Sequence, residues 1–175
     1  MSLTRIDEKV IQYTVWLNGN THLGTALVQL PEIKMPTESL KGAGIAGVIE
    51  STTPGYFEPM TLTMNWRTTS TQEATRLLAP NSHFIVLRAA IQVFDKVAQE
   101  TLEVGKTVTF RATTISHALG KVEGASAMDG NTVMSCSYLK NEEDSRVLYE
   151  IDQLNSIYNV NGKDYLARRR SILGL

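Results

Sequence analysis

The sequence predicts a mostly β protein, built as an antiparallel β-sandwich or open barrel with a flanking short helix. Apolar and polar residues alternate with period two in several segments, which is typical of half-buried strands. Asn-Gly and proline signals separate many of these segments, as expected between antiparallel strands. The length of 175 residues fits one domain, 1–175, with a sizeable core.

The first strand is predicted over residues 9–17, with Ile11, Tyr13, Val15 and Leu17 on one face. The sequence Asn-Gly-Asn at residues 18–20 follows it and predicts a hairpin turn. A second strand is therefore expected from about residue 21 to residue 30.

The clearest alternation lies in residues 60–67. One face is apolar (Met60, Leu62, Met64, Trp66) and the other is polar (Thr61, Thr63, Asn65, Arg67). A helix is predicted over residues 71–79, because Ser70 can cap it, Glu73 completes a capping box and Pro80 ends it.

Four further strands are predicted over residues 83–94, 106–115, 131–139 and 146–154. The inward residues expected in the first two are Ile85, Leu87, Ala89, Ile91, Val93, Val108, Phe110 and Ala112. A short terminal helix is expected after Asp164.

Residues 41–59 do not fit a compact domain, because they are rich in glycine and form a long loop. Disordered linkers rarely carry as many large apolar side chains as this segment does. The segment is therefore predicted to be a projecting arm that buries those side chains on another molecule.

Composition excludes several classes of protein. The formal net charge of −1 argues against a dedicated nucleic-acid binder. Cys136 is the only cysteine, so a disulfide within the chain and a cysteine-based zinc site are excluded. No Sec signal peptide and no membrane-spanning segment are expected, and synthesis in a host cytoplasm is expected.

Candidate chemical groups are better explained as structural. His22, His83 and His117 are far apart and lack metal-site spacing. Cys136 lies in an alternating strand and is interpreted as a small buried hydrophobe. The glycine-rich residues 41–47 lack the motif of a phosphate loop. No catalytic, cofactor-binding or metal-binding residue is predicted.

Three segments resemble the major tail tube proteins of contractile-tailed phages, a family that includes the tubes of R-type pyocins. They are VWLNGNTHLGTALVQLPEIKMPTESLKGAGIAG (15–47), MTLTMNW (60–66) and LYEIDQLNSIYNVNGKDYLARRRSILGL (148–175). Residues 83–130 match only in strand pattern.

The resemblance implies a structural subunit without catalytic residues or cofactor. Homo-oligomeric, hexameric rings would join their sheets into one barrel and stack into the inner tube of a phage tail. The implied partners are a sheath protein, a baseplate or tube initiator and a tape measure, and DNA would pass through transiently. The implied location is the virion tail or a phage-tail-like particle, not a membrane.

Two segments are expected to contact neighbouring subunits. For the arm at 41–59, the contact residues are Ile45, Val48, Ile49, Tyr56 and Phe57. For a C-terminal docking segment at 163–175, they are Leu166, Arg168, Arg169, Arg170, Ile172, Leu173 and Leu175. The three arginines have two interpretations: contact with phosphate or an acidic partner, or favourable interaction with the helix dipole.

The candidates for facing the lumen are Thr61, Thr63, Asn65, Thr107, Thr109 and Thr113. Short hydroxyl side chains hold a passing polyanion weakly, and Arg67 and Arg111 are expected to be paired with carboxylates or to lie at subunit contacts. The same faces could instead point outward to a sheath.

Two alternatives stay open from sequence. One is the tube of a phage-tail-like bacteriocin or secretion particle without DNA cargo. The other is a small β-barrel ligand-binding protein or enzyme, for which the sequence offers no convergent set of titratable groups.

Overall fold

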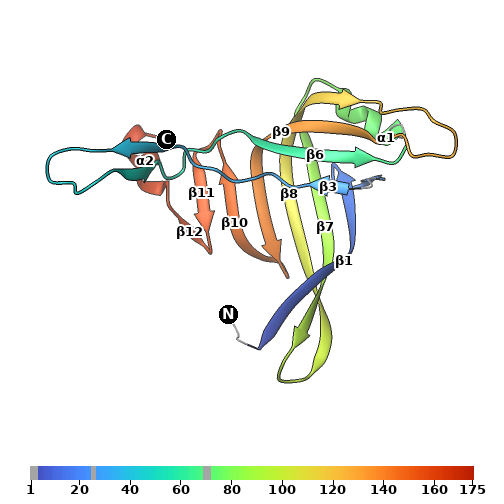
Figure 1. Cartoon of the computed structure of the whole chain (residues 1–175), viewed down its shortest axis with the longest axis horizontal. Coiled ribbons are helices and arrows are strands. Elements are labelled where there is room, and N and C mark those ends of the chain that lie inside the picture. The colour runs from blue at the N-terminus through green and yellow to red at the C-terminus, as the bar shows by residue number, and fades with distance from the viewer. Residues whose placement is uncertain (1–3, 25–26, 69–71) are drawn as a thin grey trace.

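The computed structural model describes residues 4–24, 27–68 and 72–175. The protein is predominantly antiparallel β structure with short helices, as the sequence predicts, and one projecting hairpin (Figure 1). The elements are β1 (Arg5–Leu17), β2 (Thr21–Leu23), β3 (Leu27–Gln29), β4 (Thr37–Leu40), β5 (Ile49–Thr52), β6 (Met60–Trp66), α1 (Gln72–Thr75), η1 (Arg76–Leu78, a 3-10 helix), β7 (His83–Asp95), β8 (Glu100–Ala118), β9 (Gly130–Glu143), β10 (Arg146–Asp152), β11 (Ile157–Val160), β12 (Lys163–Asp164) and α2 (Ala167–Leu173).

The main sheet has the order β12-β11-β10-β9-β8-β7-β1-β2, and β3 and β6 branch from it. The branch arises in β9, whose first half pairs with β6 and whose second half pairs with β10. Ser137 is the extra residue between these halves, since Arg111 pairs with Tyr138 and Ala112 pairs with Cys136. The chain thereby forms two layers, and β6 runs across the direction of β7 and β8 (Figure 1).

One hydrophobic core lies between the layers. The apolar face of β6 is fully buried there, as predicted, together with alternate residues of β1, β7, β8 and β9. Ala74 of α1 and Leu77 of η1 close one end. The fully buried members with the largest side chains include Phe110, Leu17, Leu23, Met60, Leu62, Met64, Leu77, Ile85 and Met134.

The first strand departs from the predicted alternation. Val15 and Leu17 are buried and Tyr13 is partly buried, but Ile11 is 47% exposed. The register of β1 against β7 shifts between Asp7 and Lys9 and again between Val10 and Gln12. Each bulge adds an unpaired residue and bends the strand, so Ile11 leaves the face that the sequence pattern assigned to it.

The strand expected over 21–30 is two strands with different partners. β2 pairs with β1, and β3 pairs with β6. The Asn18-Gly19 turn forms as predicted, with positive φ at both residues.

The predicted helix over 71–79 is one turn of α-helix followed by a 3-10 turn. Ser70, its expected cap, lies outside the described residues, and Glu73 falls in α1. The Thr114 hydroxyl donates to the Leu77 carbonyl at 2.5 Å, which satisfies a carbonyl at the end of the 3-10 turn.

Candidate assembly surfaces

The expected loop at 41–59 is largely a β-hairpin. β4 and β5 form a separate two-stranded sheet in which Leu40 pairs with Ile49. Gly44 and Gly47 in its tip have φ of +86° and +126°, a conformation that other residues rarely adopt. Figure 1 shows this hairpin (teal) extending beyond the rest of the molecule. We call residues 37–52 the arm.

The five residues expected to contact a neighbour from the arm differ in burial. Ile45, Val48 and Ile49 are exposed on the arm, with Val48 at 68%. Tyr56 is exposed, but Phe57 packs edge-on against Tyr158 with ring centroids 5.1 Å apart. Phe57 therefore belongs to the base on which the arm stands, since its ring contacts its own chain.

Residues 53–58 form that base. Backbone hydrogen bonds tie it to the extended segment that precedes β4, from Thr53 N to Pro36 O and from Glu58 N to Lys34 O. Gly55 has a φ of +75°, and a Cβ atom there would overlap the side chain of Leu166. The base therefore lies directly against the C-terminal segment.

The C-terminal segment contains α2 and its approach. Leu166, expected to contact a neighbour, is only 3% exposed and is buried in its own chain. Ile172, Leu173 and Leu175 are all exposed, with Ile172 at 74%. The apolar surface left for a neighbour is thus at the far end of α2.

Two of the three arginines bind their own chain. Arg169 Nη2 donates to the Pro54 carbonyl at 2.9 Å. Arg170 donates to the Ser156 carbonyl at 2.7 Å and pairs with Asp164 at 2.5 Å. The hydrogen bond from Arg170 lowers the pKa of Asp164. The Arg168 side chain is exposed and makes no hydrogen bond or ion pair with the described residues.

The lumen candidates divide into two groups. In the first, register places Ser135 between Thr61 and Thr113, and Thr63 beside Val133. This group (Thr61, Thr63, Asn65, Thr113) is the outer surface of β6 and the adjoining ends of β8 and β9.

The second group is on the main sheet. Here Thr107 lies between Arg88 and Glu142, and Thr109 lies between Val86 and Lys140. Thr109 is 6% exposed, so it is not the surface hydroxyl that the alternation predicted. We call this surface of β7, β8, β9 and β10 the long-strand face.

Thr61, Thr63 and Asn65 of the first group point away from the second group, whereas Thr113 shares the outward face of β8 with Thr107 and Thr109. Met60 and Leu62 of β6 and Leu87 and Val108 of the main sheet belong to one core. Side chains alternate along each strand, so the residues between these face outward on opposite sides of that core. A single channel can therefore be lined either by the β6 residues or by the long-strand face, but not by both.

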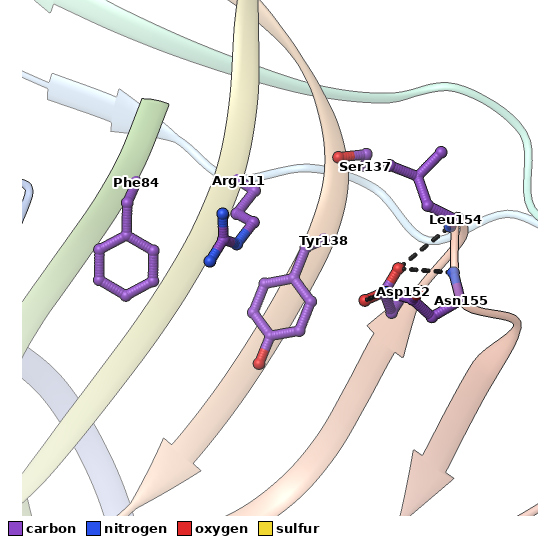
Figure 2. Close-up of a pocket in the computed structure, with 7 residues that line it drawn as sticks. All are labelled: Phe84, Arg111, Ser137, Tyr138, Asp152, Leu154 and Asn155. Carbon is purple, nitrogen blue, oxygen red and sulfur yellow. Dashed lines mark hydrogen bonds between the residues drawn. The ribbon is translucent and has the colours of Figure 1, made fainter. Parts of the chain in front are cut away.

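Arg111 lies at one end of the long-strand face, in a hollow of about 440 Å³ (Figure 2). Its guanidinium stands 5.7 Å from the centre of the Phe84 ring, within range of a cation–π contact. Asp152, two strands away, accepts hydrogen bonds from the backbone of Leu154 and Asn155. Among the described carboxylates, none makes an ion pair with Arg67 or Arg111, so the expectation that they lie at subunit contacts stays a prediction.

One pair of opposite charges on the long-strand face is balanced locally. Lys140 pairs with Glu142 at 3.1 Å. The Tyr138 hydroxyl donates to Glu150 at 2.7 Å, and burial together with this bond raises the pKa of Tyr138. A neutralised pair adds little attraction for a passing polyanion.

The candidate chemical groups have structural partners. His83 Nε2 donates to the Ala79 carbonyl, and His117 contacts Thr132, which also accepts from Trp66. No group of three or more His, Cys, Asp and Glu among the described residues could hold a metal ion. No helix in the described ranges is long and apolar enough to span a membrane.

Cys136 is buried, and burial raises the pKa of its thiol to about 12. We expect the folded protein to resist a bulky thiol reagent at pH 8 and to react fully after unfolding in urea. Absorbance of the released thiol product measures this. Fast reaction of the folded protein would contradict the buried position.

A projecting apolar arm, an exposed apolar helix end and a wide sheet define the class: a structural subunit that assembles with others. The pattern of the phage tail tube protein FII family matches residues 7–174, so the chain belongs to that family and is a tail tube subunit.

Two solved structures share its fold. A PVC extracellular contractile injection system, its sheath/tube terminator in the extended state, matches with a TM-score of 0.57 and 10% identity over 78% of this chain and 97% of that one. The sheath–tube complex of the PVC system matches with a TM-score of 0.52 and 11% identity over 75% of this chain and 88% of that one. None of the curated proteins compared with the chain matches it.

Sequence reasoning missed three features of these surfaces. The arm begins at Thr37, four residues before the predicted boundary, because the short strand β4 has no apolar alternation to reveal it. The contact of Gly55 with Leu166 joins segments more than a hundred residues apart. The Arg111–Phe84 contact depends on the β7–β8 register, which alternation alone does not fix.

Proposed function

We propose that copies of this chain form hexameric rings that stack into a tube, with the arm and the end of α2 contacting neighbouring subunits. The observation that carries the proposal is the arm. A two-stranded hairpin is marginally stable alone, and this one exposes Leu40, Val48 and Ile49. Apolar groups on a projecting element gain stability when a partner covers them.

Electron microscopy of the purified protein tests this proposal directly. Rings or tubes with sixfold symmetry are the expected result. A sample that stays monomeric at high concentration, under conditions where the protein is folded, would contradict it.

The long-strand face is the better candidate for the channel wall. β7, β8 and β9 have 13, 19 and 14 residues and lie side by side, so they present a broad, unbroken surface that can serve as a stretch of wall. The β6 surface is shorter, because β6 has seven residues and β3 has three. On this proposal Thr107 remains a lumen candidate, Thr61, Thr63 and Asn65 belong to the outer wall, and Thr113, on the same face of β8 as Thr107, is assigned to neither.

Thiol labelling separates the two walls. In assembled tubes we expect a bulky reagent to label a Thr107→Cys variant at least roughly tenfold more slowly than a Thr61→Cys variant, because a close-packed wall excludes the reagent. Both variants should label readily before assembly, and Cys136 should stay unlabelled. Faster labelling of Thr107→Cys than of Thr61→Cys in tubes would reverse the assignment.

The same proposal implies what passes through the tube and which proteins assemble with it. We propose a sheath around the tube, a baseplate or initiator at one end, a tape measure and a place in a virion tail, with synthesis in the host cytoplasm and transient passage of DNA. The likeness to an extracellular contractile injection system supports the alternative, a phage-tail-like particle, for which we propose no DNA cargo. Nucleic acid extracted from purified particles distinguishes these two cargoes. We propose no enzymatic role, because the titratable groups described above have structural partners.

A further inference from the structure

The arm needs support at its base. β4 and β5 pair with each other in a sheet separate from the main one. The two legs of the arm are joined through Pro36 and Thr53, but this bond does not tie the legs to the main sheet. A two-stranded hairpin held only by its own legs has no fixed direction.

The C-terminal segment supplies that support through two contacts, and β11 of the main sheet adds a third. Arg169 donates to the Pro54 carbonyl. The Leu166 side chain fills the space above Gly55, where a Cβ atom has no room. Phe57 stands edge-on to Tyr158, which in turn lies beside Tyr165 at 5.8 Å. The contacts are thus polar, aliphatic and aromatic, and all three reach the same few residues of the base.

Hydrogen bonds and an ion pair hold the C-terminal segment in place. Asp164 accepts a hydrogen bond from Leu166 N at 2.9 Å and pairs with Arg170. Arg170 also donates to the Ser156 carbonyl, and Tyr165 N donates to the Tyr158 carbonyl at 2.8 Å. These bonds hold the approach to α2 against β11, which belongs to the main sheet.

From this geometry we infer that residues 164–170 act as a clamp that sets the direction of the arm, with Leu166 and Arg169 as the positioning residues. The inference rests on the proposed role of the arm in assembly. On this inference the C-terminal segment has two roles. Its buried part orients the arm within one subunit, and its exposed end contacts a neighbour. The adjacent arginines accordingly have different roles, because Arg168 touches neither the base nor β11.

The test measures the direction of the arm in the unassembled subunit. Spin labels on Ala46→Cys at the arm tip and Thr113→Cys on β8 report the distance between arm and body by pulsed electron resonance. Leu166→Ala and Arg169→Gln are compared with Arg168→Gln, which makes the same change of charge on the neighbouring residue. Arg169 is exposed, so its variant retains the fold even where Leu166→Ala loosens the helix.

We expect the distance distribution to broaden roughly twofold in Leu166→Ala and measurably in Arg169→Gln, and to keep its original width in Arg168→Gln. Unchanged widths in both clamp variants would overturn the inference. Equal broadening in Arg168→Gln would overturn it too, because it would show a general effect of charge.

Polymerisation of the same unlabelled variants is read separately by sedimentation. Variants with a broadened arm that assemble as fast as the original would count against the arm as an assembly element. The clamp would stand in that case, so failure of the inference and failure of the proposed function give different results.

Discussion

Replacing residues 39–50 with the dipeptide Asn-Gly is expected to abolish tube formation while leaving a folded subunit. Glu38 and Ser51 face each other in the arm, so a two-residue turn can join them without strain. The replacement removes Leu40, Val48 and Ile49 but keeps the base at 53–58. Sedimentation and electron microscopy measure assembly, and circular dichroism measures folding. Normal tubes from this variant would rule out the arm as a subunit contact.

A matched pair of variants separates the apolar surface of the arm from its length. Leu40→Thr with Ile49→Thr removes one apolar cross-strand pair, and Ser39→Thr with Glu50→Thr changes the pair on the opposite face. Both variants place threonine pairs in the same hairpin, so its strand propensity is similar. We expect the first to weaken assembly at least roughly tenfold through lost apolar burial, and the second to have a small effect.

Phe110→Ala should be the most destabilising single substitution in the sheet. The ring is fully buried in the core, and large-to-small changes at such a position cost about 3–5 kcal/mol. The free energy of unfolding of an ordinary domain is about 5–15 kcal/mol, so the variant should be only marginally stable. Urea unfolding followed by fluorescence measures the change in the free energy of unfolding.

Phe84→Ala is the control, because Phe84 is the neighbour in β7 of Ile85, which pairs with Phe110, but lies on the opposite, long-strand face. Its ring is partly exposed and contacts Arg111, so truncation should cost less, about 1 kcal/mol. Equal losses for the two variants would show that the core does not lie where the structure places it.

Strands with one face in the core were the most predictable part of the fold. Residues 60–67 and 83–94 were predicted almost to their observed bounds, because burial on one side imposes a strict alternation. β8 was predicted too short, since residues 100–105 extend past the main core and carry only the short apolar alternation of Leu102 and Val104. The bulges of β1 could not be predicted, because a bulge is an irregularity of pairing and leaves no fixed pattern.

The assembly surfaces were less predictable for a physical reason. An apolar side chain in a loop or tail signals that something covers it, but not which molecule does so. Leu166 and Phe57 are covered by their own chain, whereas Val48 and Ile172 are not. Alternation has the same limit: it separates core from surface, but it does not say on which side of a two-layer fold a surface residue lies.

The position of the core between the β6 surface and the long-strand face has a consequence for how this protein can evolve. Substitutions at Thr61 and Thr107 are separated by a packed layer and share no partners, and effects of such distant changes usually add. Under the proposed wall assignment, selection could therefore change the residues that line the channel without changing those on the outer surface of the tube. The reverse change would be equally open to it.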